Sequence, residues 1–351
     1  MTARALRASE LSRTTYRDIA LYSPDRTPCA IDLSDNTNLW GTPPASEAEL
    51  RAAPSVMRYP SLYAPALKRA LATYAGVEPE SIVTGCGSDD VLDSAIRAFA
   101  EPGSRVAHPQ PSFAMIPIFA RMNGLEPVAI PLRRDFDIDA EALLATHARV
   151  IYICSPNNPT GTLASPESIA RVIDGAEGIV ILDEAYAEFA GTGFIAAAPS
   201  LENVLVVRTM SKAFGLAGLR IGYACGMPEL VAEVEKSRGP YKVSVVAERA
   251  AIAALEGDLE WVGARVDEAL QNRTEFVESL HDMGLAPIPS RANFVLVPVT
   301  DATRVASVLR ERGVAVRPFT ALPGIGDALR ITIGPWAMMD ACLSALWQAL
   351  A

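Results

Sequence analysis

The sequence predicts an α/β fold: a larger domain built on a mainly parallel sheet, followed by a smaller α+β domain. Over the first two-thirds of the chain, short β-branched runs alternate with amphipathic stretches, which is the pattern of strands joined by helices. After about residue 240 the alternation gives way to a long helical pattern and then to closely spaced strands. With 351 residues, of which 50% are hydrophobic, the chain has enough apolar material for two domains of ordinary size.

The strands expected in the larger domain are apolar runs bounded by glycine, proline or polar residues. Such runs are typical of strands that are buried on both faces, as in a parallel sheet. Between them, apolar residues recur at helical spacing. The predicted strands cover residues 81–84, 150–154, 179–182 and 204–207, and the predicted helices cover residues 64–74, 89–100 and 166–175.

The C-terminal third is expected to form the smaller domain, entered through one long helix. The helical pattern covers roughly residues 247–283, strands follow at 294–297, 314–316 and 329–333, and a short helix lies near 302–312. Residues 1–30 show no clear period and are expected to form an arm that packs on another part of the assembly. The predicted division is an arm at 1–30, a larger domain at 31–245 and a smaller domain at 246–351.

Composition and charge argue against several classes of function. The net charge of -10 and the pI near 5.0 disfavour binding to nucleic acid or anionic membranes, because both depend on clustered Lys and Arg. Five cysteines without metal-binding spacing and only three histidines predict reduced thiols and no metal site. No apolar stretch approaches the ~20 residues that a bilayer requires. The basic N-terminus lacks the apolar segment of a secretion signal, so a cytoplasmic location is expected.

The most informative stretch runs from Arg208 to Arg220 and contains Lys212. Lys212 follows the apolar residues 204–207 and precedes small residues and glycines, a setting that favours a buried amine. Burial lowers the pKa of a lysine because it disfavours the charged form, and the neutral amine can condense with an aldehyde. The best-known aldehyde partner of a protein lysine is pyridoxal 5'-phosphate (PLP).

Polar motifs follow three of the predicted strands. Residues 85–89 link a strand to a helix, where free N–H groups and the helix dipole favour phosphate, although an ordinary helix cap explains them equally well. Asp183 and Tyr186 follow one strand, and Asn158 lies in the turn-forming run 155–161 after another. Ligands collect at the C-terminal strand ends of open α/β sheets, so these residues are candidates for one site. The plainer alternatives are a cap for Asp183, a buried aromatic for Tyr186 and a simple loop for Asn158.

Taken in order, these motifs resemble those of fold-type I PLP enzymes of the class I/II aminotransferases. The resemblance depends on residues 85–89, 155–161 and 183–186, and on Ser211-Lys212 with Arg220 eight residues later. Within that group the chain is most similar to the histidinol-phosphate aminotransferases, from about residue 32 to residue 347. The resemblance implies a mainly parallel seven-stranded sheet sandwiched by helices.

The resemblance also implies a role for each matching residue in the cofactor site. Lys212 would hold PLP covalently and then shuttle protons, Asp183 would pair with the ring nitrogen, and Tyr186 with Asn158 would bind the phenolic oxygen. Lys212, Asp183 and Tyr186 are thus the expected catalytic residues. Phe113 falls where the family usually has a tyrosine stacked on the ring, so stacking is kept and a hydroxyl is lost. The expected phosphate-binding residues are Gly87, Ser88, Asp89 through its backbone N–H, Thr209, Ser211 and Arg220.

Four further residues are assigned through the resemblance alone. Tyr59 corresponds to a tyrosine lent to the cofactor phosphate of the neighbouring subunit, which implies a homodimer; a hydrophobic staple is the alternative. Arg330 matches the arginine that binds a substrate α-carboxylate through two parallel hydrogen bonds. Arg317 matches the arginine used for the substrate phosphate, with a surface ion pair as the alternative, and Tyr22 corresponds to a tyrosine that reaches the same phosphate.

Residues 35–41 depart from the family's usual Asn-Glu-Asn-Pro-Tyr-Gly pattern. This segment lines the substrate mouth in the family, so Asn36 is a candidate substrate-binding residue. Thr37 replaces an acid that is thought to favour an imidazole side chain, and Leu39 replaces a proline. These departures bear on the substrate and leave the cofactor assignment intact.

The implied reaction is a PLP-dependent transamination between a small-molecule amino donor and an oxo-acid acceptor. The resemblance points to histidinol phosphate or a related amino substrate, with glutamate and 2-oxoglutarate as the partner pair. Two alternatives stay open: an aminotransferase for aromatic or other amino acids in a different biosynthetic pathway, and a lyase similar to threonine-phosphate decarboxylase. A PLP-binding regulator would add a DNA-binding domain, for which this chain has no room.

Overall fold

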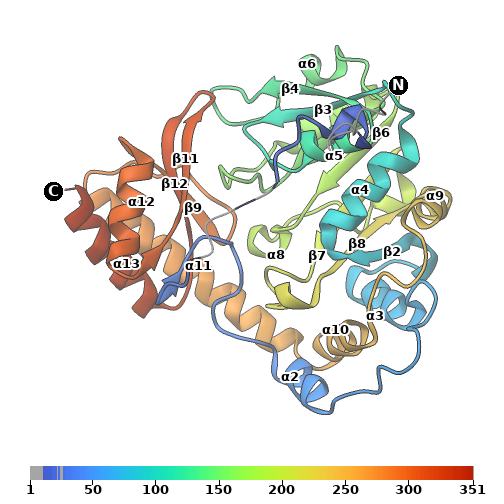
Figure 1. The fold of residues 1–351 in the computed structure, drawn as a ribbon, viewed down its shortest axis with the longest axis horizontal. Helices are drawn as coiled ribbons and strands as arrows, with labels where there is room; N and C mark the ends of the chain where they lie inside the picture. The colour runs from blue at the N-terminus through green and yellow to red at the C-terminus, as the bar shows by residue number, and fades with distance from the viewer. Residues whose placement is uncertain (1–10, 22, 24–26, 351) are drawn as a thin grey trace, which may run out of the picture.

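The computed structural model describes residues 11–21, 23 and 27–350, and its main feature is a seven-stranded sheet. The strand order is β2-β8-β7-β6-β5-β3-β4, with β8 antiparallel to both neighbours and the other adjacent pairs parallel (Figure 1). The predicted seven-stranded, mainly parallel sheet is therefore confirmed. The strands are β2 (Ile82–Cys86), β3 (Arg105–Gln110), β4 (Glu126–Pro131), β5 (Val150–Cys154), β6 (Ile179–Asp183), β7 (Val204–Thr209) and β8 (Ile221–Gly226).

Helices cover both faces of this sheet. Successive residues of each central strand point to opposite sides, so both faces are apolar and both must be buried. Ile151 and Ile153 of β5 enter one apolar core, whereas Val150 and Tyr152 enter the other. The first core contains residues of α3 (Pro65–Ala75), α6 (Ala140–Leu144), α7 (Pro166–Gly175) and α10 (Val245–Gly257). The second contains residues of α4 (Gly87–Phe99), α5 (Ile116–Met122) and α9 (Pro228–Arg238).

Local sequence explains where these helices begin, and α7 is an example. Ser165 precedes the helix, and its hydroxyl oxygen accepts a hydrogen bond from the backbone N–H of Ser168 at 3.1 Å. Pro166 occupies the first helical position, where its missing N–H costs nothing. Ile169 and Val172 then lie on one face and are buried in the core.

The C-terminal part is built on a three-stranded antiparallel sheet of order β11-β12-β9, with long helices beside it (Figure 1). β11 (Arg317–Leu322) pairs with β12 (Gly326–Thr332) so that Arg317 lies opposite Arg330, and β12 pairs with β9 (Phe294–Pro298). The helices are α11 (Leu259–Asp282), α12 (Ala302–Glu311) and α13 (Trp336–Leu350). Shorter helices elsewhere are α2 (Pro44–Arg51), α8 (Ala187–Ala190) and the 3₁₀ turns Thr14–Tyr16, Pro79–Ser81, Ala198–Ser200 and Ala217–Leu219.

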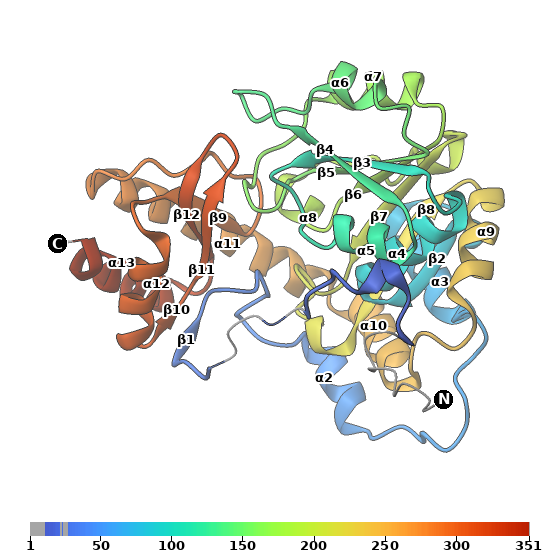
Figure 2. The ribbon, with the colours of Figure 1, turned by 45° about the horizontal axis from the view of Figure 1, so that its top comes forward.

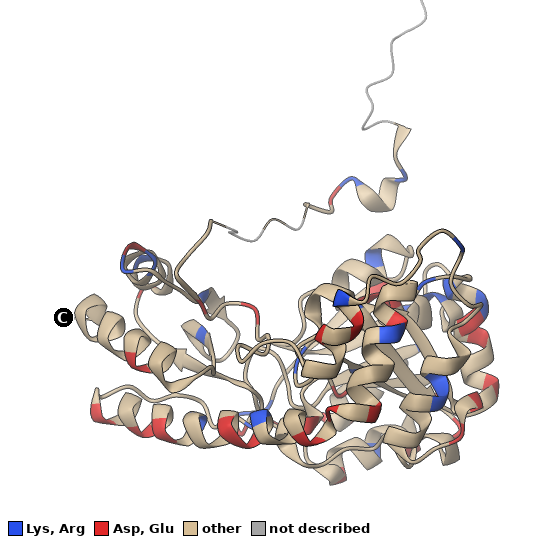
Figure 3. Ribbon diagram, turned by 90° about the horizontal axis from the view of Figure 1, so that it is seen from below, with Lys and Arg blue, Asp and Glu red and all other residues tan. Residues whose placement is uncertain are grey.

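The single long helix expected over residues 247–283 is instead two helices, α10 and α11, separated at Asp258. The Asp258 carboxylate accepts hydrogen bonds from the backbone N–H groups of Ala45, at 2.9 Å, and Ser46, at 3.4 Å. This tertiary contact with α2 ties the break to the N-terminal part of the chain. α11 then runs away from α10 toward the C-terminal sheet, and acidic residues, red in Figure 3, predominate over basic ones along it. No helix among the described residues is long and apolar enough to cross a bilayer.

The segment that follows residue 30 leads from the C-terminal part to the large domain (Figure 2), where it contacts the turn after β7. Its strand β1 (Ile31–Asp32) pairs with β10 (Val314–Ala315), and Leu33 O accepts from the N–H of Thr332 at 2.9 Å. Farther along, Asn38 Nδ2 donates to Ala213 O, also at 2.9 Å. These contacts fix the backbone of the intervening residues 35 and 36 close to Lys212.

Candidate active site

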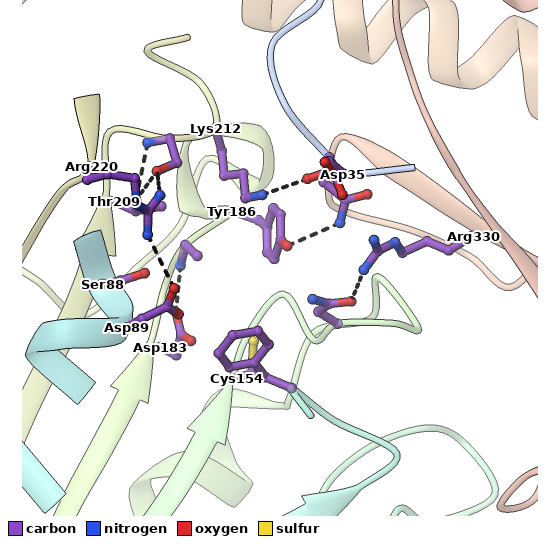
Figure 4. A pocket seen from close by; sticks show the side chains of 15 residues that line it. Asp35, Ser88, Asp89, Cys154, Asp183, Tyr186, Thr209, Lys212, Arg220 and Arg330 are labelled. Atoms are coloured by element: carbon purple, nitrogen blue, oxygen red, sulfur yellow. Dashed lines mark hydrogen bonds and ion pairs between the residues drawn. The ribbon is translucent and has the colours of Figure 1, made fainter. Parts of the chain in front are cut away.

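Polar side chains converge where β2, β5, β6 and β7 end, because these strands run in the same direction in the sheet. They surround a cavity of about 190 Å³, shown in Figure 4, that is completed by the segment containing Asp35 and by Arg330 from β12. The cavity is lined by Asp35, Asn36, Ser88, Asp89, Phe113, Cys154, Asn158, Asp183, Ala185, Tyr186, Thr209, Ser211, Lys212, Arg220 and Arg330.

Lys212 lies in the turn after β7, with its side chain directed into the cavity (Figure 4). Its Nζ donates a hydrogen bond to the main-chain oxygen of Asp35 at 2.9 Å and lies 5.8 Å from the centre of the Tyr186 ring. Burial, assisted by the positive charge of Arg330, lowers the pKa of Lys212 to about 8. An amine of this kind is a nucleophile and a proton carrier near neutral pH.

Asp183 is the last residue of β6 and is only 4% exposed. Its carboxylate accepts hydrogen bonds from the Tyr152 hydroxyl at 2.7 Å and from the N–H of Ala185 at 3.1 Å. Burial raises the pKa of Asp183 to about 6, against the opposing effect of these two donors. A protonated heterocycle placed beside Asp183 would supply the positive charge that a buried carboxylate favours.

An anion-binding surface forms where β2 passes into α4. Gly87 begins this helix with φ +82°, and a Cβ atom there would collide with the guanidinium of Arg220. Arg220 Nη1 lies 3.5 Å from Ser211 Oγ, which in turn accepts from the Thr209 hydroxyl at 3.0 Å. The helix start, the guanidinium and the hydroxyls thus surround one end of the cavity, as a phosphate group requires.

Asp89 lies in the first turn of α4, and its carboxylate forms an ion pair with Arg220 at 3.2 Å. Both side chains are almost half exposed, so this pair contributes little to stability. A phosphate dianion in the same place would compete with the Asp89 carboxylate for Arg220. The backbone N–H of Asp89, rather than its side chain, is the group suited to such a ligand.

Arg330 lies at the opposite side of the cavity and is held by two short hydrogen bonds. Its Nη1 donates to Asn158 Oδ1 and its Nη2 donates to Ser34 O, each at 2.6 Å. The guanidinium also stacks near the rings of Phe294 and Phe319, at 5.5 and 5.7 Å from their centres. Because Arg330 occupies the oxygen of the Asn158 amide, the nitrogen of that amide is the atom suited to donate to a ligand.

Tyr186, 3% exposed, is oriented by Asn36, whose Nδ2 donates to the tyrosine hydroxyl oxygen at 3.1 Å. The ring also packs edge-on against Phe294, with 5.1 Å between centroids. Burial raises the pKa of Tyr186, so its hydroxyl keeps its proton at neutral pH. Phe113 completes this part of the lining with an apolar ring.

Among the described residues, Gly87, Tyr59 and Arg317 were assigned through the resemblance but are not in the cavity lining. Tyr59 is 83% exposed and stacks on Tyr241 with ring centres 5.0 Å apart. Arg317 lines a neighbouring cavity of about 340 Å³, to which Asp35 and Arg310 also contribute. Tyr22 lies outside the described residues.

The structure also adds residues that the sequence motifs did not indicate. Tyr152 donates to Asp183, Cys154 and Ala185 line the cavity, and the main-chain oxygen of Asp35 accepts from Lys212. The available signal was a tyrosine within an otherwise apolar strand, two residues before its C-terminal end. A main-chain oxygen such as that of Asp35 carries no side-chain signal.

The residues present fit PLP. An anion-binding surface and a buried carboxylate that favours a cationic ring nitrogen line the same cavity as Lys212, Tyr186 and Asn158. The glycine at position 87 lets the guanidinium of Arg220 lie against the start of α4, so that both border the same end of the cavity.

Comparison with known proteins agrees with this geometry. Residues 29–346 match the family described as aminotransferase class I and II. The chain is 36% identical over 297 residues to a histidinol-phosphate aminotransferase of Thermoanaerobacter sp. (strain X514), covering 83% of this chain and 84% of that protein. It is 37% identical over 356 residues to a histidinol-phosphate aminotransferase of Methylibium petroleiphilum, covering 97% and 95% respectively.

Solved structures show the same similarity. Histidinol-phosphate aminotransferase from Sinorhizobium meliloti, in complex with pyridoxal-5'-phosphate, superposes with a TM-score of 0.84 at 29% identity, covering 92% of this chain and 91% of that one. The chain therefore belongs to the class I and II aminotransferases and is a PLP-dependent transferase.

Proposed function

We propose that the enzyme transfers an amino group between histidinol phosphate, or a related phosphorylated amine, and the glutamate/2-oxoglutarate pair. The relatives named histidinol-phosphate aminotransferase support this proposal. The structural observation that carries it is the register of β11 and β12, which sets Arg317 opposite Arg330. Directly opposed residues share one face of an antiparallel pair, so two arginines lie next to each other beside Asp35.

Within this proposal the two arginines divide the recognition of anions. Arg330, held by Asn158 and Ser34, would bind the carboxylate of glutamate. Arg317 would bind the phosphate of the other substrate from the neighbouring cavity, with Tyr22 from the N-terminal arm as a further contact. Asn36 lines the same cavity as Arg330 and would contact the part of the substrate nearest Tyr186.

Bound PLP supplies an aldehyde that reacts with amines and a pyridine ring that accepts electrons. Lys212 would hold the aldehyde and then carry a proton between the substrate Cα and the cofactor, which its pKa of about 8 permits. Asp183 would hold the proton on the ring nitrogen, while Tyr186 and Asn158 would donate to the phenolic oxygen. Gly87, Ser88, Asp89 N–H, Thr209, Ser211 and Arg220 would bind the phosphate, and Phe113 would stack on the ring.

The proposal extends to assembly and domain organisation. An exposed Tyr59 is suited to reach the cofactor phosphate of a second copy, so the enzyme would act as a homodimer. The cofactor would be bound by a domain of residues 31–245, with residues 246–351 as the smaller domain and residues 1–30 as an arm. The five free cysteines are in keeping with a cytoplasmic enzyme.

A half-reaction screen tests the substrate. The PLP-loaded enzyme is mixed separately with histidinol phosphate, glutamate, phenylalanine, tyrosine and threonine phosphate, and loss of the cofactor absorbance near ~420 nm is followed. We expect rapid loss with histidinol phosphate and glutamate, and much slower loss with histidinol, the matched compound without phosphate. No reaction with histidinol phosphate refutes the substrate, and release of carbon dioxide from threonine phosphate would instead identify a lyase.

A further inference from the structure

Asn36 connects Thr332, at the end of β12, to Tyr186 through a set of buried hydrogen bonds. Its N–H donates to Thr332 Oγ1 at 2.9 Å, its main-chain oxygen accepts from Asn293 Nδ2 at 3.0 Å, and its Nδ2 donates to the Tyr186 hydroxyl oxygen at 3.1 Å. Asn36 and Thr332 are each 1% exposed. Asn36 has φ +57°, a left-handed conformation that asparagine tolerates better than most residues. The residue is therefore fixed on several sides.

The orientation of the Asn36 side-chain amide follows from the hydroxyl of Thr332. Thr332 Oγ1 already accepts from the Asn36 N–H and lies 3.2 Å from Asn36 Oδ1, to which it donates its own hydrogen. If the amide were turned over, its nitrogen would face Thr332, and among the described residues the hydroxyl hydrogen would have no acceptor. A buried donor without an acceptor is costly, so the oxygen of the amide faces Thr332 and the nitrogen faces Tyr186.

This orientation decides what the Tyr186 hydroxyl can do. The amide nitrogen carries only hydrogens, so the tyrosine oxygen must accept from it. The tyrosine's own hydrogen can then be donated into the cavity, where the phenolic oxygen of PLP would accept it. In the reversed orientation, the Tyr186 hydroxyl would donate that hydrogen to the side-chain oxygen of Asn36.

We propose that Thr332 is a positioning residue: through the amide of Asn36, it makes Tyr186 a hydrogen-bond donor to the phenolic oxygen of PLP. The inference rests on the role proposed above for Tyr186 and deepens it. Thr332 itself contacts Asn36 and the backbone of Leu33 and acts only through this chain.

Absorbance provides a readout other than activity. A hydrogen bond donated to the phenolic oxygen stabilises its anionic form and so favours loss of the proton bound by the cofactor chromophore. Losing that bond raises the pKa of the chromophore, measured by spectrophotometric pH titration of the PLP-loaded enzyme without substrate. The charged and titratable groups nearest Tyr186 are Lys212, Arg330, Asp183 and Cys154, and the substitutions of Thr332 leave all of them in place.

The experiment compares Thr332→Val, which removes the hydroxyl at nearly constant shape, with Thr332→Ser, which keeps it. We expect Thr332→Val to raise the chromophore pKa by about one unit, while Thr332→Ser stays at the wild-type value. Thr332→Cys, a weaker donor, gives a smaller shift in the same direction and serves if the valine variant does not fold. Tyr186→Phe should shift the pKa by at least as much as Thr332→Val, and adding Thr332→Val to it should have no further effect.

The outcomes separate this inference from the role of Tyr186. If Tyr186→Phe leaves the chromophore pKa unchanged, the role of Tyr186 is wrong and the inference fails with it. If Tyr186→Phe shifts the pKa but Thr332→Val and Thr332→Cys do not, only the inference fails. An equal shift by Thr332→Val with and without the Tyr186 hydroxyl would also overturn it, because the effect would not pass through that hydroxyl.

Discussion

The side-chain nitrogen of Lys212 donates to the main-chain oxygen of Asp35 over 2.9 Å. A carbonyl oxygen aims the amine without supplying the full negative charge that would hold it protonated. Burial and the nearby charge of Arg330 lower the pKa of Lys212 to about 8, partly opposed by the Asp35 carboxylate. The contact thus orients the nitrogen and keeps its neutral form accessible.

The cofactor-free protein should therefore capture PLP faster as pH rises, with a midpoint near pH 8, because only the neutral amine reacts. The measurement is the rate of chromophore formation at constant ionic strength. The reference is lysine acetylated on its α-nitrogen, which keeps the side-chain amine reactive. Arg330→Gln should move the midpoint to higher pH, since it removes a charge that lowers the pKa. A midpoint at the ordinary lysine value of 10.5 would show that the amine is not desolvated.

Ionisation of Asp183 should destabilise the cofactor-free protein. Its pKa is about 6 in the folded chain and 3.8 ordinarily, so the folded state holds the proton to higher pH than the unfolded state does. The stability contributed by this protonation is present below pH 4 and is lost as pH rises through 6. Relative to Asp183→Asn, the unfolding free energy of the wild type should fall by about 1–1.5 kcal/mol between pH 5 and pH 8. Urea denaturation of both proteins measures this, and a constant difference would contradict it.

Arg208 and Glu184 form a buried ion pair beside the cavity. Arg208 directly precedes Thr209, and Glu184 directly follows Asp183. Their side chains are 12% and 4% exposed, and Nη2 lies 2.8 Å from Oε2. Arg208→Met should lower the unfolding free energy by about 3–5 kcal/mol, because it leaves a buried carboxylate unpaired. Adding Glu184→Gln should restore part of the loss.

The matched control for the buried pair is Arg171→Met, which removes an exposed pair with Glu141 and should lower the unfolding free energy far less than Arg208→Met does. Chemical denaturation of the wild type and the three variants makes the comparison. Equal losses from Arg208→Met and Arg171→Met would mean that burial of the Arg208 pair adds nothing.

Arg330→Lys keeps the positive charge but cannot reproduce two parallel hydrogen bonds to a carboxylate. The KM for glutamate should therefore rise roughly 10–100-fold. Arg317→Lys should leave the KM for glutamate near the wild-type value and raise the KM for histidinol phosphate. Steady-state kinetics with both substrates distinguishes the arginines, and a rise in glutamate KM from Arg317→Lys would reverse their assignment.

Tyr59 should serve the active site of a second copy. In the proposed homodimer, the Lys212→Ala and Tyr59→Ala proteins would carry complementary defects, and one site of a mixed dimer would contain both Lys212 and a Tyr59 from the partner. Mixing the two inactive or weakened proteins under exchange conditions should restore tight cofactor binding in half of the mixed dimer's sites. Recovery no greater than the average of the two parents would argue against a shared site.

The sequence predicted that the candidate cofactor-binding residues gather at one cavity because most of them lie at or just after the end of a buried strand, and parallel strands end at one edge of the sheet. It could not reveal partners that are distant in the chain. Thr332 meets Asn36 across 296 positions, and this contact exists only once β12 is built. The contact of Tyr152 with Asp183 was not predicted for another reason: an aromatic residue within an apolar strand is typical of a hydrophobic core.

Two of the strands missed by the hydrophobic pattern, β4 and β8, have identifiable causes. β4 contains Pro127 and Pro131, which an edge strand tolerates but which argue against a strand in sequence. β8 contains Gly222 and Gly226, and at Gly222 a Cβ atom would collide with the backbone of Gly87 and Ser88 at the start of α4. The glycines that allow α4 to approach β8 at the anion-binding surface thus also weaken the hydrophobic pattern of the strand.

The most direct test of the account is to reduce the PLP-loaded enzyme with borohydride, digest it and map the pyridoxyl group by mass spectrometry. The chain contains four lysines, so the possible positions are few. The account predicts the label on Lys212 alone and its absence from the Lys212→Ala protein. A label on Lys68, Lys236 or Lys242 in place of Lys212, or no label at all, would contradict it.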